Sequence, residues 1–337
     1  MRNSELLLSI VAVAAAGLVS AGLTWAIRPL LLQYALAKPN ARSSHRVPTP
    51  QGAGIAVVAA TLLVAGVAAA FADLSHATIP VAVLLAALFI AIVGFADDIK
   101  PIAVLPRLML QALAVGLVVF SAPGDLQIVP ACPLWIERSL LLMAGLWFVN
   151  LVNFMDGLDW MTVAEVVPVA GAIIALGSFS ELPQSATIVA AALFGAVLGF
   201  APFNRPVAKV FLGDVGSLPI GLLLGWCLLQ LAYSQQFTAA LLLPLYYLAD
   251  ATVTLLRRLL RGEQFWTAHR SHFYQRATDN GFTVMAVVSE VFALNAGLAV
   301  LAIASTMTAS TAIRLCLLLL GGAATALVIY RFSRRAA

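Results

Sequence analysis

Long apolar runs separated by short polar segments dominate the sequence. A bilayer core about 30 Å thick is crossed by a helix of roughly 20 apolar residues, and eleven runs approach that length. They lack the polar alternation of barrel strands, so helices are predicted. The pattern indicates an all-α, polytopic membrane protein with about eleven transmembrane helices in a single domain, 1–337. The runs lie near 6–27, 53–72, 79–96, 107–122, 138–152, 162–178, 187–203, 216–233, 238–256, 282–304 and 311–331.

Composition and charge agree with this class. Hydrophobic residues make up 62% and charged residues 10% of the chain, whereas about 25% of a soluble domain is charged. One set of alternating connections holds sixteen of the nineteen basic residues, leaving only Arg2, Arg138 and Arg314 on the other side. Basic loops favour the cytoplasm, so the amino terminus is predicted outside, in the periplasm, and the carboxyl terminus in the cytoplasm. The net charge of +4 reflects this asymmetry, and no basic tract indicates nucleic acid.

The stretch from Asn150 to Asp159 is the most polar segment between two apolar runs. Asn150, Asn153 and Asp156 are spaced to share one helical face, and Asp159 follows at the next step. Carboxylates beside hydrocarbon are expensive to desolvate, so this stretch is interpreted first as a functional site. The alternative is a polar loop that only meets the lipid headgroups.

A pair of adjacent acids, Asp97 and Asp98, directly follows the third apolar run. Adjacent carboxylates repel each other, so a cation or a hydrogen-bond donor is expected close by. A metal or phosphate site is one interpretation. A structural salt bridge with Lys100 or Arg107 is the other.

The segment 204–217 combines an acid with donors and an aromatic residue. Asp214 stands between two glycines, where the backbone can turn tightly, and Ser217 is expected to cap the helix that follows. Asn204 adds donors and Phe211 adds a stacking surface. The alternative is a simple Gly-Asp turn with an exposed acid.

Two further segments on the same predicted side are basic. The first contains His45 among prolines and glycines and suits an anion, or merely follows the positive-inside rule. The last contains Arg270, His272 and Arg276, whose side chains donate to phosphate oxygens. Asp250, within an apolar run, has no assigned role beyond hydrogen bonding in the bundle. The five polar segments predicted to form one site are 28–52, 97–107, 153–161, 204–217 and 257–281.

These segments together offer carboxylates for a divalent cation, donors for phosphates and an aromatic ring for a flat group. Mg²⁺ keeps few protein ligands and completes its shell with phosphates and water, which suits scattered Asp and Asn side chains. A P-loop and a Rossmann glycine fingerprint are absent from the sequence. The predicted substrate is a nucleotide diphosphate bound at the inner membrane surface. Because every acidic segment opens to the bilayer, the acceptor of the transferred group could itself be a lipid.

The order of these motifs resembles one family. The chain resembles the polyprenyl-phosphate N-acetylhexosamine-1-phosphate transferases of glycosyltransferase 4 type. Four motifs carry the resemblance, in this order: Pro-Asn with His45 and Pro-Thr-Pro, Asp97-Asp98, Asn-x-x-Asn-x-x-Asp-Gly-x-Asp from Asn150, and Phe-x-Gly-Asp-x-Gly-Ser from Phe211. The resemblance implies a Mg²⁺-dependent enzyme, with Mn²⁺ as the alternative ion. It would transfer an N-acetylhexosamine 1-phosphate from a UDP-sugar to undecaprenyl phosphate, releasing UMP.

The resemblance also implies a role for each motif residue. Asp214 and Asn153 would hold the metal ion. Phe211 would stack on uracil beside Asp159 and Asn204. Asp98, helped by Asp97, would position or deprotonate the lipid phosphate. The further residues implied are Asp156 and His272 as catalytic groups and His45, Asn150, Arg270 and Arg276 as substrate-binding groups.

The last polar segment departs from the family pattern. Many members carry His-x-His-His there, whereas His272 is followed by Phe-Tyr-Gln-Arg. This segment is similar to the branch that starts O-antigen or other surface-polysaccharide chains in Gram-negative bacteria, with Arg276 replacing a histidine. The sugar stays open between GlcNAc, FucNAc and QuiNAc. The branch implies the bacterial inner membrane and a cytoplasmic site. A homodimer is an open expectation.

A secondary transporter is the alternative class. It predicts acidic residues near the bilayer midplane, broken helices and two related halves. The acids of the motifs fall instead at predicted cytoplasmic helix ends, and the sequence shows no internal repeat.

Overall fold

The computed structural model describes residues 2–37, 48–71, 79–179, 182–264 and 269–336. In this part the regular structure consists of helices and two paired two-residue strands, β1 (Leu36–Ala37) and β2 (Thr49–Pro50). The helices are α1 (Arg2–Tyr34), α2 (Gly54–Phe71), α3 (Val81–Ile99), α4 (Val104–Phe120), α5 (Leu134–Met155), α6 (Met161–Phe179), α7 (Gln184–Phe200), α8 (Asp214–Tyr233), α9 (Phe237–Leu242), α10 (Leu245–Leu260), α11 (Phe273–Asp279), α12 (Val284–Thr306) and α13 (Thr311–Phe332).

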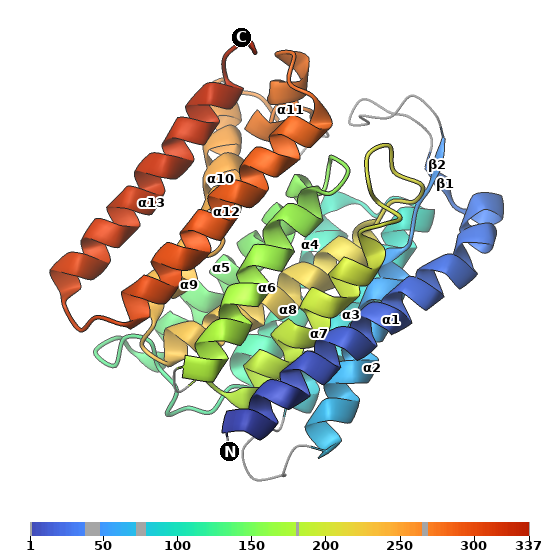
Figure 1. Cartoon of the computed structure of the whole chain (residues 1–337). Coiled ribbons are helices and arrows are strands. Elements are labelled where there is room, and N and C mark those ends of the chain that lie inside the picture. Colours follow the sequence, from blue (N-terminus) through green and yellow to red (C-terminus); the bar gives the residue numbers. More distant parts are fainter. Residues whose placement is uncertain (1, 38–47, 72–78, 180–181, 265–268, 337) are drawn as a thin grey trace.

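Most of these helices run along one direction, and the first and last helices place the two ends of the chain at opposite ends of the bundle (Figure 1). Among the described residues, seven helices are long and apolar enough to cross a membrane, and three shorter apolar helices, α2, α4 and α7, lie among them. The prediction of an all-helical chain with several membrane spans is therefore confirmed. The count of eleven crossings and the sides of the termini stay predictions.

One predicted run is divided in the structure. The run 238–256 forms α9 and α10, which are separated at Leu243 and Pro244. Proline lacks an amide hydrogen and disfavours helix at the residue before it, which is compatible with a division at this position. The segment 257–281 also contains a helix, α11, that apolar periodicity did not predict.

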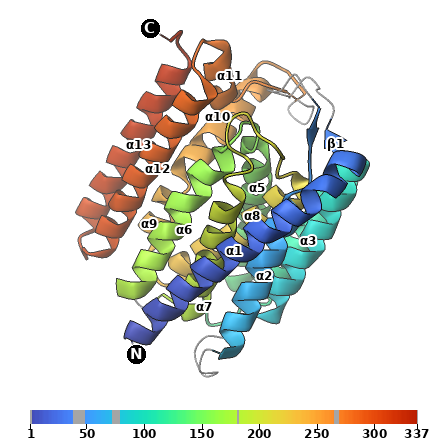
Figure 2. The ribbon, with the colours of Figure 1, turned by 45° about the vertical axis from the view of Figure 1, so that its right-hand side comes forward.

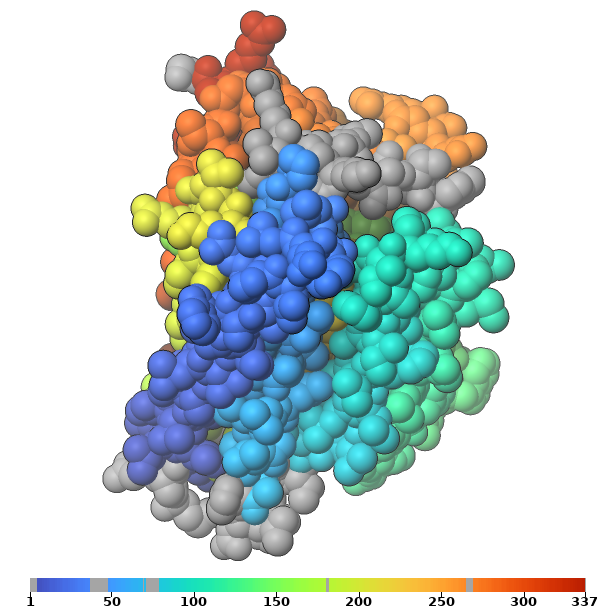
Figure 3. Space-filling view, turned by 90° about the vertical axis from the view of Figure 1, so that its right-hand side faces the viewer, coloured from blue at the N-terminus to red at the C-terminus, as the bar shows by residue number. Residues whose placement is uncertain are grey.

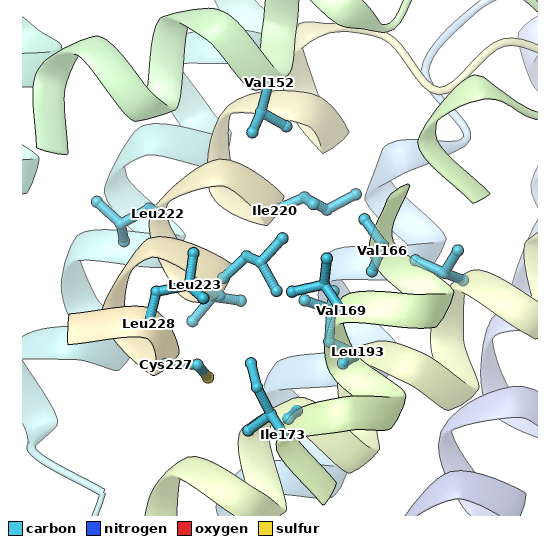
Figure 4. Packing of buried hydrophobic residues seen from close by; sticks show 14 of the residues in the cluster. Val152, Val166, Val169, Ile173, Leu193, Ile220, Leu222, Leu223, Cys227 and Leu228 are labelled. Atoms are coloured by element: carbon cyan, nitrogen blue, oxygen red, sulfur yellow. The ribbon is translucent and has the colours of Figure 1, made fainter. Parts of the chain in front are cut away.

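The core of the bundle is built around α8. Of an 18-residue apolar stretch of α8, 83% is buried, compared with 22% for α1 and 11% for α13. Figure 4 shows Ile220 and Leu223 of α8 packed with Val166 and Ile173 of α6 and Leu193 of α7. The outer helices expose apolar side chains, which suits a surface that faces lipid.

The outer helices form distinct faces. Helices α12 and α13 lie side by side along one flank, and the 45° turn of Figure 2 keeps them together. On the face shown in Figure 3, α1 and α2 lie beside α3 and α4.

Close backbone approaches hold α2, α3 and α8 together. A Cβ atom on Gly54 would overlap the backbone of Gly216, and a Cβ atom on Gly94 would overlap the backbone carbonyl of Asp214. Lipid is as apolar as leucine, so membrane helices associate through such tight packing rather than through the hydrophobic effect. These contacts fix the start of α8 next to α2 and α3, where the polar segments meet.

Candidate functional site

Polar side chains from distant parts of the chain meet at one end of the bundle, where α3 and α5 end and α8 begins. We call this the polar end. Asp98, Asn153 and Asp214 come from these three helices. The two strands and α11 lie at the same end (Figure 1).

Asp98 caps the amino terminus of α8. Its Oδ1 accepts hydrogen bonds from the Asp214 amide at 2.9 Å and from Gln51 Nε2 at 2.5 Å, and its Oδ2 accepts one from the Val215 amide at 3.0 Å. A carboxylate is favoured there by the unpaired amides and by the positive end of the helix dipole. The cap therefore comes from α3.

The prediction that Ser217 caps this helix is wrong. The helix begins at Asp214, so Ser217 lies inside its first turn, where its hydroxyl accepts a hydrogen bond from Asn153 Nδ2 at 2.8 Å. Sequence reasoning could not detect a cap supplied by a residue more than one hundred positions earlier.

Asp97 has different partners. Its Oδ2 forms an ion pair with Arg107 at 2.8 Å, and its Oδ1 accepts a hydrogen bond from the Ile102 amide at 2.6 Å. Successive helical residues point about 100° apart, which lets the two adjacent acids serve two different elements. The salt-bridge interpretation thus describes Asp97, while Asp98 faces α8.

Asn153 and Asp214 are in direct contact. Asn153 Nδ2 donates to Asp214 Oδ1 at 2.8 Å, which links the last turn of α5 to the first turn of α8. Asn150, one turn earlier, is not in this cluster. Its amide donates to Gln111 Oε1 at 2.7 Å and to the Leu146 carbonyl at 2.8 Å, inside the bundle.

Asp156 follows α5 directly and accepts a hydrogen bond from the Thr162 hydroxyl. Burial raises the pKa of its carboxyl to about 7, the Thr162 bond opposes the shift, and the carboxylates of Asp214, Asp98 and Asp159 raise it further. Within the described residues, no basic side chain forms an ion pair with Asp98, Asp156 or Asp214. The polar end thus concentrates negative charge that a cation would stabilise.

Asp159 and Asn204 hold two connections against each other. Asp159 Oδ2 accepts a hydrogen bond from the Ala208 amide at 2.9 Å. Asn204 Oδ1 accepts one from the Trp160 amide at 2.8 Å, and its Nδ2 donates to the Val210 carbonyl at 3.1 Å. Both side chains are buried, so these contacts set the position of the segment that leads to Asp214.

Phe211 connects this segment to the first polar loop. Its amide donates to the Pro50 carbonyl at 2.8 Å, its carbonyl accepts from the Ala53 amide at 3.0 Å, and it forms a parallel bridge with Gln51. Its side chain is partly exposed. His45, predicted to bind substrate from the same loop, lies outside the described residues.

The last polar segment packs on the turn after α5. His272 is 2% exposed, and its ring stacks on Phe154 with centroids 6.2 Å apart. Tyr274 donates through its hydroxyl to the Phe154 carbonyl at 2.9 Å. A Cβ atom on Gly157 would overlap that hydroxyl, so glycine is required for this approach.

The two predicted arginines of this segment differ. Arg270 is held by Asp279 at 3.0 Å and by the Thr278 hydroxyl at 2.9 Å. Arg276 is partly exposed, and within the described part of the chain its guanidinium has no ion pair or side-chain hydrogen bond. Arg276 is therefore the better placed of the two to bind an anion.

Several residues at the polar end were missed by sequence reasoning. Gln51, Trp160 and Thr162 are uncharged, so nothing in the charge pattern marked them. Trp160 adopts a φ of 64°, unusual for a residue other than glycine, and its indole donates to the Ala201 carbonyl at 2.6 Å. Local strain of this kind is not visible in a sequence.

The fold and the polar end define an integral-membrane helical bundle with acidic, amide and basic groups gathered where the connections meet. A family model described as glycosyl transferase family 4 matches residues 80–232, a span that includes Asp98, Asn153, Asp156 and Asp214. The last polar segment lies outside that span.

Curated relatives agree with this match. The decaprenyl-phosphate N-acetylglucosaminephosphotransferase of Mycobacterium leprae is 27% identical over 307 residues, covering 81% of this chain and 77% of that protein. The protein of that name in Mycolicibacterium smegmatis is 28% identical over 290 residues, with 76% and 71% covered. The phospho-N-acetylmuramoyl-pentapeptide-transferase of Streptococcus gordonii is 30% identical over 222 residues, with 61% and 67% covered. The chain belongs to the polyprenyl-phosphate sugar-phosphate transferase family.

Proposed function

We propose that this enzyme transfers an N-acetylhexosamine 1-phosphate from UDP-GlcNAc, UDP-FucNAc or UDP-QuiNAc to undecaprenyl phosphate. One observation carries the proposal: the acids Asp98, Asp156 and Asp214 gather beside Asn153 without an ion pair to any described basic side chain. Such a cluster at a membrane surface suits a divalent cation and a diphosphate. The names of the relatives supply the reaction class.

The donor set fits Mg²⁺, with Mn²⁺ as the alternative. The described residues contain no group of three or more His, Cys, Asp or Glu side chains arranged around one metal position. Mg²⁺ needs no such cage, because water and substrate phosphates complete its octahedron. Asp214 and Asn153, already in contact, would hold the ion. When bound, it would neutralise charge on the diphosphate.

The amide of Asn153 can present either of its two ends. In the structure its nitrogen donates to Asp214 and Ser217. A 180° rotation of the amide would instead direct its oxygen toward a cation beside Asp214, since the two orientations have the same shape.

The chain's own groups would orient the two substrates. Asp159, Asn204 and Phe211 would bind the nucleoside, while Arg270, Arg276 and His272 would face the diphosphate. Asp98, with Asp97 beside it, would position the lipid phosphate. An oxygen of that phosphate attacks the sugar-linked phosphorus, the bond from this phosphorus to the bridging oxygen breaks, and UMP leaves.

Direct displacement suits the geometry of Asp98. Both of its oxygens already accept hydrogen bonds, three in all, which hold the carboxylate against the start of α8. A phosphate monoester has a second pKa near ~6, so the lipid phosphate is largely a dianion at neutral pH and needs positioning more than deprotonation.

The product would start O-antigen or another surface polysaccharide. We place the enzyme in the bacterial inner membrane with the polar end in the cytoplasm, because the basic residues gather on that side. A homodimer stays a prediction.

The proposal is tested by transfer of label from each UDP-sugar to undecaprenyl phosphate in detergent with Mg²⁺. Wild type should place label in the organic phase, and Asp214→Asn or EDTA should abolish it. Glu137→Gln is the matched control, because Glu137 is a buried carboxylate that accepts amide bonds from Ile128 and Val129 in the connection before α5. Folded wild type that is silent with all three sugars contradicts the proposal.

A transporter is supported by the division between α9 and α10 and by the buried acid Asp250 within α10. Uptake of intact solute into vesicles, without label entering lipid, would favour that function. The acids at the ends of α3 and α5 and at the start of α8 argue against it, since ion pathways place such groups near the midplane.

A further inference from the structure

Asp250 lies in the middle of α10, and its side chain is fully buried. We infer that Asp250 is a positioning residue for the transfer reaction, because its carboxylate fixes the start of α11 and the ring of His272 at the polar end. The inference rests on the proposed function.

The carboxylate of Asp250 has four donors. The Phe273 and Tyr274 amides donate to Oδ1 and Oδ2 at 2.9 and 3.0 Å. The Tyr246 and Thr254 hydroxyls donate at 3.1 and 3.3 Å. The acid thus joins the first turn of α11 to α10 across more than twenty residues of chain.

The same carboxylate lies beside His272. Asp250 Oδ1 is 3.4 Å from His272 Nδ1, an electrostatic contact rather than an aligned hydrogen bond. Among the described residues Nδ1 has no other partner, although it is buried. A carboxylate favours a proton on the nearer ring nitrogen, so Nδ1 carries the proton and Nε2 is left as the acceptor.

The contacts of His272 and Tyr274 extend to the last turn of α5, which carries the proposed metal ligand Asn153. The His272 ring lies on Phe154, the residue after Asn153, and the Tyr274 hydroxyl donates to the Phe154 carbonyl. When Asp250 is replaced by a neutral residue, a buried backbone amide of α11 loses its carboxylate acceptor. The proton of His272 is then no longer directed to Nδ1. His272 and Arg276, which begins the next turn, would then lose their position relative to the diphosphate.

Four proteins test the inference: wild type, Asp250→Asn, His272→Ala and the double variant. Glu137→Gln is again the control, since that carboxylate also accepts two backbone amides, at 3.0 and 2.9 Å, but in the connection before α5. For each protein, kcat, the KM for the UDP-sugar and Tm are measured.

Asp250→Asn should lower kcat roughly 10- to 100-fold, the scale of a small misplacement of a reacting group. Because Asp250 acts in part through His272, Asp250→Asn should slow the His272→Ala protein by a smaller factor than it slows wild type. Glu137→Gln should lower Tm but leave kcat unchanged. Independent, multiplying losses in the double variant, or an unchanged kcat in Asp250→Asn, would overturn the inference.

The tautomer gives a readout that does not need activity. The chain has four histidines, so ¹⁵N-histidine NMR spectra of wild type and His272→Ala identify the His272 signals. Wild type should show a protonated Nδ1, and Asp250→Asn should lose that preference. A protonated Nε2 in wild type would refute the inference. Wild type without transferase activity would instead refute the proposed function, and the spectra still decide the role of Asp250.

Discussion

The cap on α8 makes a prediction about stability that can be separated from catalysis. Asp98 accepts two backbone amides, at 2.9 and 3.0 Å, and the Gln51 side chain at 2.5 Å. In Asp98→Asn only one oxygen remains, so one amide of the first turn of α8 loses its acceptor. A buried donor left unpaired costs about 1–3 kcal/mol, and that is the expected loss in the free energy of unfolding. Asp98→Ala removes both acceptors and should lose about twice as much.

The assay uses a buried thiol in the same helix. Cys227 of α8 is 0% exposed, so its reaction with a maleimide dye reports unfolding once Cys132 and Cys316 are replaced by serine. Asp125→Asn, an exposed acid in the connection before α5, should label at the wild-type rate. If Asp98→Ala labels no faster than wild type at any temperature, the capping carboxylate does not hold α8 and the reasoning fails.

Three further predictions concern packing, protons and metal. Gly94→Ala should lower Tm, because its Cβ would overlap the Asp214 carbonyl and overpacking costs about 1–3 kcal/mol, whereas Gly66→Ala, which has open space, should be neutral. In metal-free buffer the stability of the fold should fall as pH rises from about 4 to about 7, because the pKa of Asp156 is raised from 3.8 to about 7 in the folded protein. Asp156→Asn should make this decline in Tm shallower over the same pH range. Mg²⁺ should raise the Tm of wild type but not of Asp214→Asn, as measured by the same thiol labelling.

Hydropathy predicted the helical class well, because a helix that crosses lipid must be long and apolar whatever its neighbours are. It could not detect the division at Pro244. The residues around it, such as Leu243 and Leu245, are as apolar as those of a continuous span, so the run kept its hydrophobic signal. Helix α11 was missed for a related reason, since it is short and its fold depends on Asp250 rather than on its own periodicity.

The candidate site was partly predictable because its motifs are dense in acids and amides. Asn153 and Asp214 were predicted to belong to one metal site, and in the structure Asn153 Nδ2 lies 2.8 Å from Asp214 Oδ1. The sequence also grouped Asn150 with them by helical spacing. One helical face extends along the bundle, however, and Asn150 faces Gln111 a full turn away from the polar end.

Two carboxylates at the polar end have the same structural role, since each accepts hydrogen bonds from the first amides of a neighbouring helix. Asp98 from α3 holds the first amides of α8, and Asp250 from α10 holds the first amides of α11. Each capped helix carries a proposed substrate or metal group near its start, Asp214 in α8 and Arg276 in α11. The groups that would face the diphosphate are therefore aligned by acids on neighbouring helices. Substitutions that shift α3 or α10 should disturb the reaction even where they touch no substrate.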